Sequence, residues 1–479
     1  MPTLRLFNTL GRELQEFAPL VPGKVGFYGC GPTVYDYAHL GNMRPYVLHD
    51  TLVRTLRYLG FEVTHVMNIT DVGHLSGDSD TGEDKMVKRA EERGKSVYEI
   101  AEFYTEAFFR DTGRLGVARP TVVCKATEHV GEMIALIGRI EAKGFTYSAG
   151  GNLYFDVTKF PGYGDLALLR LEDLKAGARV EIDPNKRNPA DFALWFTKSK
   201  FENQAMLWDS PWGRGYPGWH IECSAMSMKY LGEQFDIHAG GVDHIPIHHT
   251  NEIAQSEAAT GRKWVNYWIH NEWLLFGKIK MAKSSGEFLT LQSVVDRGYD
   301  PLDYRYFLLG AHYRSQLQFA WEGLDSARAA RRSLVDRVLA LRGKAEPAPL
   351  AGIGDKARGY LSSFVDAMAD DLSTPRALAA LWGALRDADL PPAEALAVAF
   401  DMDRILGLGL AAARRAEEAP VDPALAAWVE GLVAERAAAK KARDFARADA
   451  IRAELAAKGV SLADGPGGTT WKLAPGTRA

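Results

Sequence analysis

The sequence predicts an α/β protein in which a parallel sheet is interrupted by an insertion and followed by a helical region and a small C-terminal region. Two apolar runs, at residues 25–28 and 61–68, have the length and composition of buried strands. The first run is followed by three glycines and a proline, which break regular structure, and then by valine and leucine at helical spacing. Strands that alternate with helices in this way are typical of a parallel sheet.

The composition describes a globular protein of several domains, with 479 residues, 47% hydrophobic and 25% charged. Residues 1–20 contain Arg5, Arg12, Glu13 and Glu16 and do not predict a secretory signal, and the chain has no apolar run of about 18 residues that predicts a membrane span. Three cysteines do not make a disulfide framework, so we expect a protein of the reducing cytoplasm. The net charge of -4 is mildly against a nucleic-acid partner, although local basic patches can do the binding.

The loop after the first predicted strand, within residues 27–44, leads into a helix whose buried face includes Val47, Leu48, Leu52, Leu56 and Leu59. The start of a helix offers unpaired backbone N–H groups and the positive end of the helix dipole, which together bind anions. His39 and Asn42 lie at this start and could donate to phosphate oxygens. The alternative interpretation is an ordinary strand-to-helix turn with a capping histidine.

A second stretch, at residues 277–286, contains three lysines around two serines and two glycines. A basic loop of this kind can close over a triphosphate and offset the charge that grows on a leaving pyrophosphate. The alternative is a solvated surface loop.

Cysteine, histidine and glutamate residues far apart in the sequence form a candidate metal-ligand set. Cys30 lies in the first loop, Cys223 lies further along the chain, and His248 and Glu252 are four apart and therefore share a face if the segment is helical. Two thiolates, an imidazole and a carboxylate are suitable ligands for zinc. No two cysteines are close in sequence as they are in a zinc finger, so an alternative is that the histidines here are simply polar residues near a loop.

Basic residues in the C-terminal region recur at helical spacing, and they are Arg436, Lys440, Arg443 and Arg447. This spacing predicts one basic stripe on a single helix, with a solvated helix face as the alternative interpretation. Phe445 lies among these residues and could stack on an unpaired base.

The first two stretches resemble the nucleotide-binding motifs of class I aminoacyl-tRNA synthetases. Residues 39–42 (His-Leu-Gly-Asn) are similar to the HIGH motif, and residues 280–284 (Lys-Met-Ala-Lys-Ser) are similar to the KMSKS motif. Two positions depart from the pattern. Asn42 replaces the last histidine but keeps a polar donor, and Ala282 replaces the middle serine, which we expect to weaken a loop contact without removing the chemistry.

Within this class the chain resembles the cysteinyl-tRNA synthetases, most clearly at residues 219–224 (Trp-His-Ile-Glu-Cys-Ser) and 251–256 (Asn-Glu-Ile-Ala-Gln-Ser). The similarity runs from residues 6–10 to residues 468–471. It implies a Rossmann-type catalytic domain that joins L-cysteine to tRNA-Cys at the expense of ATP. It further implies Mg²⁺ with ATP, one Zn²⁺ per chain, and we expect a monomeric cytoplasmic enzyme.

The resemblance implies five groups of site residues. The implied catalytic residues are His39, Asn42, Lys280 and Lys283. The implied ATP-binding residues are Gly31, Thr33, His39, Gly41, Asn42, Lys280, Met281, Lys283 and Ser284. The implied cysteine-binding residues are Cys30, Gly31, Thr33 and Trp219. The implied zinc ligands are Cys30, Cys223, His248 and Glu252, and the implied tRNA-binding residues are Arg436, Lys440, Phe445, Asp449 and Asp464.

Zinc explains how such an enzyme would reject serine. A purely steric pocket separates near-isosteres by only ~100-fold. Zinc prefers a soft thiolate, so a metal site selects cysteine without an editing domain, and no inserted segment is long enough to be one. Since four protein ligands already fill a tetrahedral zinc, the substrate sulfur is either a fifth ligand or displaces one, such as Glu252.

The resemblance also implies a division into domains. The predicted parts are a catalytic domain at 1–118 and 208–265, an inserted connective domain at 119–207 that contacts the acceptor end of the tRNA, a stem-contact segment with the lysine loop at 266–323, a helical bundle on the anticodon side at 324–415, and an anticodon-reading domain at 420–479. Helical spacing at 324–341, a proline- and glycine-bearing linker at 345–354 and a helix-start pattern at 373–375 agree with the bundle.

Two other functions fit part of the pattern. Ligases that join cysteine to an aminosugar share both nucleotide motifs and the zinc set, but we expect them to lack the long C-terminal region. A catalytically inactive RNA-binding relative would not need the intact His39, Lys280 and Lys283.

Overall fold

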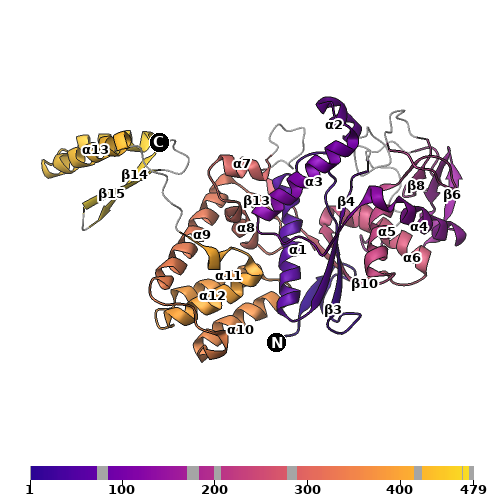
Figure 1. The fold of residues 1–479 in the computed structure, drawn as a ribbon, viewed down its shortest axis with the longest axis horizontal. Coiled ribbons are helices and arrows are strands. Elements are labelled where there is room, and N and C mark those ends of the chain that lie inside the picture. The colour runs from indigo at the N-terminus through magenta and orange to yellow at the C-terminus, as the bar shows by residue number, and fades with distance from the viewer. Residues whose placement is uncertain are drawn as a thin grey trace. The chain divides into compact units, whose positions relative to one another are not determined.

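The structure is a computed structural model, and it describes residues 2–72, 85–169, 183–198, 206–277, 289–414, 423–465 and 468–473. The chain forms two compact units, Met1–Leu291 with Pro301–Ala413, and Gln292–Asp300 with Arg414–Ala479 (Figure 1).

The first unit is built around a five-stranded parallel sheet with the strand order β11-β10-β3-β4-β5. Its strands are β3 (Lys24–Gly29), β4 (Glu62–Ile69), β5 (Val122–Lys125), β10 (Phe235–Gly241) and β11 (Val265–Asn271). The prediction of an α/β protein is confirmed, and β3 and β4 match the two apolar runs. The sheet grows from β3 toward β5 on one side and toward β11 on the other, so β3 and β10 flank a topological switch point, where open α/β sheets bind ligands.

Helices cover the sheet because their apolar residues recur on one face. They are α1 (Leu40–Tyr58), α2 (Lys85–Arg93), α3 (Val97–Arg114), α4 (Val130–Ala142), α5 (Trp219–Leu231) and α6 (Thr250–Thr260). In α1, Val47, Leu48, Leu52 and Leu56 are buried as predicted, while Leu59 lies just beyond the helix end and is only half-buried. None of the described helices combines the length and apolar character that crossing a membrane requires.

A separate antiparallel sheet lies between β5 and β10 in the sequence. Its strands are β6 (Thr146–Ala149), β7 (Asn152–Phe155), β8 (Phe192–Phe196) and β9 (Tyr216–Pro217). Tyr154 and Phe155 end β7, and Val157 begins a short 3₁₀ helix, η2 (Val157–Lys159). Although β5 falls inside the insertion predicted at 119–207, it belongs to the parallel sheet, and the antiparallel sheet continues past residue 207 to β9.

The rest of the first unit is two small sheets and a helical bundle. The sheets pair β1 (Arg5–Asn8) with β2 (Glu13–Glu16) and β12 (Leu274–Phe276) with β13 (Leu317–Phe319). The helices are α8 (Pro301–Leu309), α9 (Trp321–Arg342), α10 (Asp355–Ala369), α11 (Thr374–Arg386) and α12 (Pro392–Leu406). The helix predicted over 324–341 and the helix start at 373–375 are confirmed.

A buried ion pair attaches α1 to the bundle. The guanidinium of Arg305 on α8 is fully buried and donates to Asp50 Oδ2 on α1 at 2.6 Å. It also donates to the carbonyls of Leu406 at 2.7 Å and Leu115 at 3.1 Å. A buried charge is tolerated only when it is paired and its donors are satisfied, so these contacts hold α1, α8 and the end of α12 in one arrangement.

The second unit contains α13 (Pro423–Lys441), α14 (Phe445–Ala457) and the hairpin of β14 (Val460–Gly465) with β15 (Gly468–Leu473), together with residues 292–300, which carry most of α7 (Leu291–Asp296). Val429, Ile451, Leu455 and Val460 form its small hydrophobic core. This arrangement agrees with the small C-terminal domain that the sequence predicts.

Candidate functional site

The loop that follows β3 is held against the end of β4. The N–H of Gly31 donates to Asn68 Oδ1 at 2.7 Å, and Thr33 forms a parallel bridge with Thr70. A side chain cannot replace the hydrogen of Gly31, because a Cβ there would lie 1.7 Å from the carbonyl oxygen of Asn68. Gly31 and Thr33 therefore lie at the carboxyl end of the sheet, where the sequence predicts substrate contacts.

The first turn of α1 is capped by the two residues that were predicted to bind phosphate. The N–H of Asn42 donates to His39 Nδ1 at 3.2 Å, and the N–H of His39 donates to Asn42 Oδ1 at 3.2 Å. The capping histidine of the alternative interpretation is therefore present, but it does not exclude anion binding. Because Nδ1 accepts a hydrogen bond, a neutral His39 carries its proton on Nε2, which remains a donor. Gly41 is the second residue of this helix.

Apart from Gly277, the lysine stretch lies outside the described residues, and this includes Lys280, Met281, Lys283 and Ser284. The residues that follow it are described. The carbonyl of Leu289 accepts from the N–H of Leu40 at 2.8 Å, and Thr290 forms an antiparallel bridge with His39. The segment that follows the lysine stretch therefore lies beside the start of α1.

The four predicted metal ligands lie together. Cys30 follows β3, Cys223 lies on α5, His248 lies in a short π-helical turn, η4 (Ile245–His249), and Glu252 lies on α6. One potential ligand atom from each residue lies within 4.8 Å of those of the others, and all four residues are buried. The structure thus assembles the ligand set that sequence spacing alone left open.

The surroundings of Glu252 fit a metal better than a hydrogen-bond network. Oε2 lies 3.0 Å from His238 Nε2 and Oε1 lies 3.1 Å from His248 Nε2, but neither contact has the geometry of a hydrogen bond. Both oxygens are buried, and among the described residues neither has a hydrogen-bond donor. A buried carboxylate in this position requires positive charge beside it, which a protonated histidine or a metal ion supplies, and the two thiols and the imidazole favour zinc as the metal.

Titration of the ligands is coupled to their burial. Burial raises the pKa of the Cys30 thiol, and a hydrogen bond to Cys30 together with burial raises the pKa of Cys223 well above its usual range. Burial alone would lower the pKa of His248, but Glu252 and Cys223 raise it to about 10. Burial opposes the charge on Glu252 too, but His248 and His238 hold its pKa below the usual range. A metal would therefore displace protons from these ligands when it binds.

Trp219 and further histidines surround the cluster. The ring of Trp219 stacks on His248 with a centroid distance of 4.5 Å, so Trp219 lies beside the candidate metal ligands. His220 Nδ1 lies 2.9 Å from His248 Nδ1, which leaves Nε2 of His248 facing the other ligands. A second contact of this kind orients and fixes the tautomer of a metal-bound histidine.

The sequence analysis missed the other histidines beside this site. His249 Nε2 lies 3.3 Å from Cys30 Sγ, and His249 Nδ1 lies 2.7 Å from His270 Nε2. His270 in turn contacts Thr9 Oγ1 at 2.7 Å. His220 lies in the recognisable stretch at 219–224 and could have been found there, but His238 and His270 lie on β10 and β11, and only the sheet order brings them to the site.

In the second unit, the prediction that Arg436, Lys440, Arg443 and Arg447 form one basic stripe on a single helix is wrong. The helix ends at Lys441, Arg443 adopts a left-handed conformation with φ 61°, and α14 begins at Phe445. Arg436 is buried, and its guanidinium lies 3.4 Å from Thr469 Oγ1, while Arg447 pairs with Glu435 at 2.7 Å. Because the chain turns between two helices, these side chains do not share a face.

The other predicted tRNA-binding residues remain accessible where they are described. Phe445 is 63% exposed, and Asp449 lies four residues further along α14 and is also exposed, so the two share a helix face. Lys440 is exposed near the end of α13. Asp464 pairs with Thr469 in the β14–β15 hairpin, and its side chain lies outside the described residues.

Two family models match the chain. Residues 16–329 match the tRNA synthetases class I (C) catalytic domain, and residues 422–471 match the cysteinyl-tRNA ligase anticodon binding domain. The chain is 58% identical to a cysteine–tRNA ligase of Treponema denticola, covering 98% of this chain and 99% of the relative. It is 48% identical to cysteine–tRNA ligase 1 of Burkholderia lata, covering 97% and 96%.

Solved structures share the fold at low sequence identity. Methionyl-tRNA synthetase of Mycobacterium tuberculosis, in complex with methionyl-adenylate, matches with a TM-score of 0.53 at 15% identity, covering 80% of this chain and 90% of that one. LeuRS of Agrobacterium radiobacter K84, in a ternary complex, matches with a TM-score of 0.55 at 12% identity, covering 82% and 84%. These likenesses agree with the Rossmann-type fold that the sequence predicts.

The contact between Gly31 and Asn68 leads to a prediction about stability. In Gly31→Ala the new methyl group must push the loop away from β4, and we expect the free energy of unfolding to fall by about 1–3 kcal/mol. Gly131→Ala is the matched control, since a Cβ there meets nothing within 4 Å, and it should be neutral or stabilising. Urea unfolding followed by circular dichroism measures both, and equal stability of the two variants would contradict the prediction.

Proposed function

Since this chain belongs to the cysteine–tRNA ligase family of class I aminoacyl-tRNA synthetases, we propose that it activates L-cysteine with ATP and transfers it to tRNA-Cys. The carboxylate of cysteine attacks the α-phosphorus of ATP, giving cysteinyl-adenylate and pyrophosphate, and the cysteinyl group then passes to the terminal ribose of the tRNA. The observation that carries the proposal is the convergence of the four-ligand cluster and the start of α1 at the carboxyl end of one sheet.

His39 and Asn42 act on the triphosphate in this proposal. The Nε2–H of His39 and the amide of Asn42 donate to phosphate oxygens, and the positive end of the α1 dipole adds to their effect. Gly31, Thr33 and Gly41 keep the loop and the first turn narrow enough for backbone contacts with ATP. No general base is needed, because the attacking carboxylate is already ionised.

The lysine stretch completes the nucleotide site. Lys280 and Lys283 offset the charge on the leaving pyrophosphate, and Met281 and Ser284 line the same loop. The hydrogen bond between Leu40 and Leu289 supports this assignment, because Leu289 follows the stretch by three residues and lies beside the start of α1. Mg²⁺ accompanies ATP.

Cys30, Cys223, His248 and Glu252 hold one Zn²⁺ in this proposal. A bound zinc would supply a Lewis acid that holds the substrate thiol as a thiolate. His220 orients the imidazole of His248, and Trp219 covers the same ring and borders the cysteine pocket. Rejection of serine then follows from ligand softness rather than from size.

The C-terminal unit reads the anticodon in this proposal. Phe445 stacks on a base, and Asp449 and Asp464 accept hydrogen bonds from base amino groups, while Lys440 contacts phosphate. Arg436 is buried against β15, so we assign it a structural role instead of a phosphate contact. The match of residues 422–471 to an anticodon-binding domain favours tRNA over an aminosugar as the acceptor. We place the enzyme in the cytoplasm, where its three cysteines, none of them in a disulfide, stay reduced.

The zinc assignment is tested by metal analysis and activity. Purified protein should contain near one zinc per chain, and a chelator should abolish cysteine-dependent ATP–pyrophosphate exchange until zinc is restored. Cys223→Ser should lose zinc and cysteine activation, whereas Cys124→Ser, a buried cysteine outside the cluster, should keep both. Full charging of tRNA-Cys by metal-free protein would refute the assignment.

The role of Lys283 is tested by separating rate from binding. If Lys283 acts on charge that develops only in the transition state, Lys283→Ala should lower the rate of pyrophosphate exchange by ~100-fold or more with little change in the Michaelis constant for ATP. Lys278→Ala, in the same stretch but outside the motif, is the control and should be nearly normal. A normal rate with a raised Michaelis constant would show that Lys283 only binds the ground state.

The anticodon contacts should fail without affecting activation. Phe445→Ala and Asp449→Ala should each lower kcat/KM for charging the cognate tRNA, because each removes a base contact. The loss should correspond to roughly 1–3 kcal/mol of transition-state stabilisation. Pyrophosphate exchange should not change, since these residues lie in the second unit. Glu454→Ala, an exposed acidic residue of α14, is the control. Undiminished charging by both variants would exclude this helix face from recognition.

A further inference from the structure

Residues 311–316, here called the connector, link α8 to β13 and are held by hydrogen bonds on two sides. On one side, the backbone carbonyls of the connector accept hydrogen bonds from Arg44 on α1. The guanidinium Nη2 of Arg44 lies 2.5 Å from the carbonyl oxygen of Ser315, 3.3 Å from that of His312 and 3.4 Å from that of Tyr313.

Arg44 also holds the segment that leads into β12. Its Nη1 donates to the carbonyls of Glu272 at 2.7 Å and Trp273 at 2.6 Å. The guanidinium is buried, and the contacts recorded for it among the described residues are carbonyls rather than a carboxylate. Trp273 precedes β12 and the connector precedes β13, so Arg44 fixes this strand pair relative to the first turns of α1.

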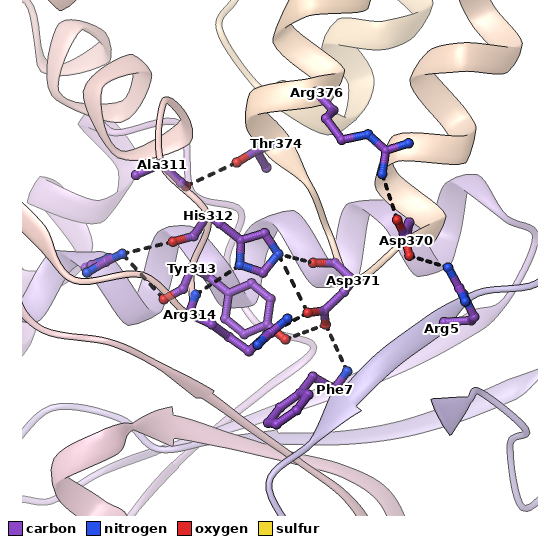
Figure 2. A network of polar contacts seen from close by, with 11 residues as sticks. Arg5, Phe7, Ala311, His312, Tyr313, Arg314, Asp370, Asp371, Thr374 and Arg376 are labelled. Atoms are coloured by element: carbon purple, nitrogen blue, oxygen red, sulfur yellow. Dashed lines mark hydrogen bonds and ion pairs between the residues drawn. The ribbon is translucent and has the colours of Figure 1, made fainter. Parts of the chain in front are cut away.

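On its other side the connector is held by Asp371 (Figure 2). The Asp371 carboxylate accepts from Tyr313 Oη at 2.5 Å, from Arg314 Nε at 2.7 Å and from the N–H of Phe7 at 2.9 Å. The carbonyl of Asp371 contacts His312 Nε2 at 3.0 Å. Asp371 is buried and lies in the turn between α10 and α11, so it ties the bundle to the connector and to β1.

The backbone at this turn does not follow local preference. Asp371 and Leu372 have φ of 55° and 54°, the left-handed region that side chains larger than glycine rarely adopt. Such conformations persist where surrounding contacts over-determine them. The network of Asp371 is one such set of contacts, and burial of Leu372 is another.

We propose that Asp371 is a positioning residue for cysteine activation. By fixing the connector, Asp371 keeps in place the backbone carbonyls that accept hydrogen bonds from Arg44. Arg44 in turn holds the start of α1, with His39 and Asn42, in a fixed position relative to β12 and β13. The inference rests on the proposed roles of His39 and Asn42 at the triphosphate. It assigns a catalytic consequence to a residue of the helical bundle that touches no substrate.

Asp371→Asn tests the proposal against Asp370→Asn. The asparagine keeps the shape and tolerates the left-handed backbone, but it cannot accept from both Arg314 and Tyr313. Asp370 is the matched control, because it is adjacent, more exposed, and pairs with Arg5 and Arg376 outside the connector. We expect Asp371→Asn to lower kcat of pyrophosphate exchange by ~10-fold, a modest share of what a 1 Å misplacement can cost. Asp370→Asn should remain within about twofold of the native rate on the same scale.

The Michaelis constant separates positioning from general damage. It should be unchanged for cysteine, since in the described part of the chain the proposed zinc ligands contact one another and neighbouring histidines rather than the connector. Circular dichroism at the assay temperature should show both variants fully folded. A raised Michaelis constant for cysteine at normal kcat, or an equal loss in Asp370→Asn, would overturn the proposal.

Amide hydrogen exchange gives a readout that does not depend on the proposed nucleotide site. Residues 311–319 should exchange faster in Asp371→Asn and not in Asp370→Asn. Faster exchange with an unchanged kcat would overturn the positioning role. His39→Ala serves as the separate test of the nucleotide site, because normal kcat in that variant would refute the proposed function of His39 whatever Asp371 does.

A double-mutant cycle with Arg44→Lys completes the test. If both residues act through the connector, the double variant should be little slower than the slower single variant. If the fold reduction in kcat of the double variant equals the product of the two single reductions, the two residues act independently and the proposal fails.

Discussion

The constraint on which the site depends is the position of β3 in the middle of the parallel sheet. The chain extends the sheet from β3 in one direction through β4 and β5, and in the other through β10 and β11. Loops on the two sides therefore diverge at the carboxyl end of β3 and leave room there. Cys30 comes directly after β3, while the elements that follow β9 and β10 supply Cys223, His248 and Glu252. Because β10 pairs with β3, the segments that follow β10 bring His248 and Glu252 to Cys30, and α5, which precedes β10, supplies Cys223.

The charged cluster at the carboxyl end of β3 requires unusual local structure and the burial of a carboxylate. The Glu252 carboxylate is removed from water, and His238 and His248 lie within 3.1 Å of its oxygens. The loop beside it must pass so close to β4 that only glycine fits at residue 31. A π-helical turn, which is rare in proteins, carries His248. Departures of this kind from regular structure are common at binding and catalytic sites, where surrounding contacts hold them in place.

The sequence predicted the parts of the fold and site that depend on short segments. β3, β4 and α9 follow from local periodicity, and the metal set followed from residue types once the resemblance was recognised. The failures have physical reasons. The break at Arg443 interrupts a sequence pattern that is continuous at helical spacing. It could not be predicted, because helical spacing does not reveal a left-handed residue that is neither glycine nor asparagine. His238 and His270 lie near the site because of the strand order of the sheet. Strand order depends on tertiary contacts, so the residues next to these histidines in the sequence do not reveal it.

Helix α1 combines requirements that are usually met by different elements. Its first turn presents His39 and Asn42, its second turn contributes Arg44, its middle contributes Asp50, and its apolar face packs on the sheet. Arg44 is satisfied by carbonyls of the connector and of the segment before β12, and Asp50 by Arg305 of the bundle. Polar groups buried in this way have strict geometric demands, because an unmet donor or acceptor costs more than an apolar contact returns. The helix is therefore fixed by groups whose alternatives are unfavourable, which suits a reaction that depends on positioning charge rather than on moving protons.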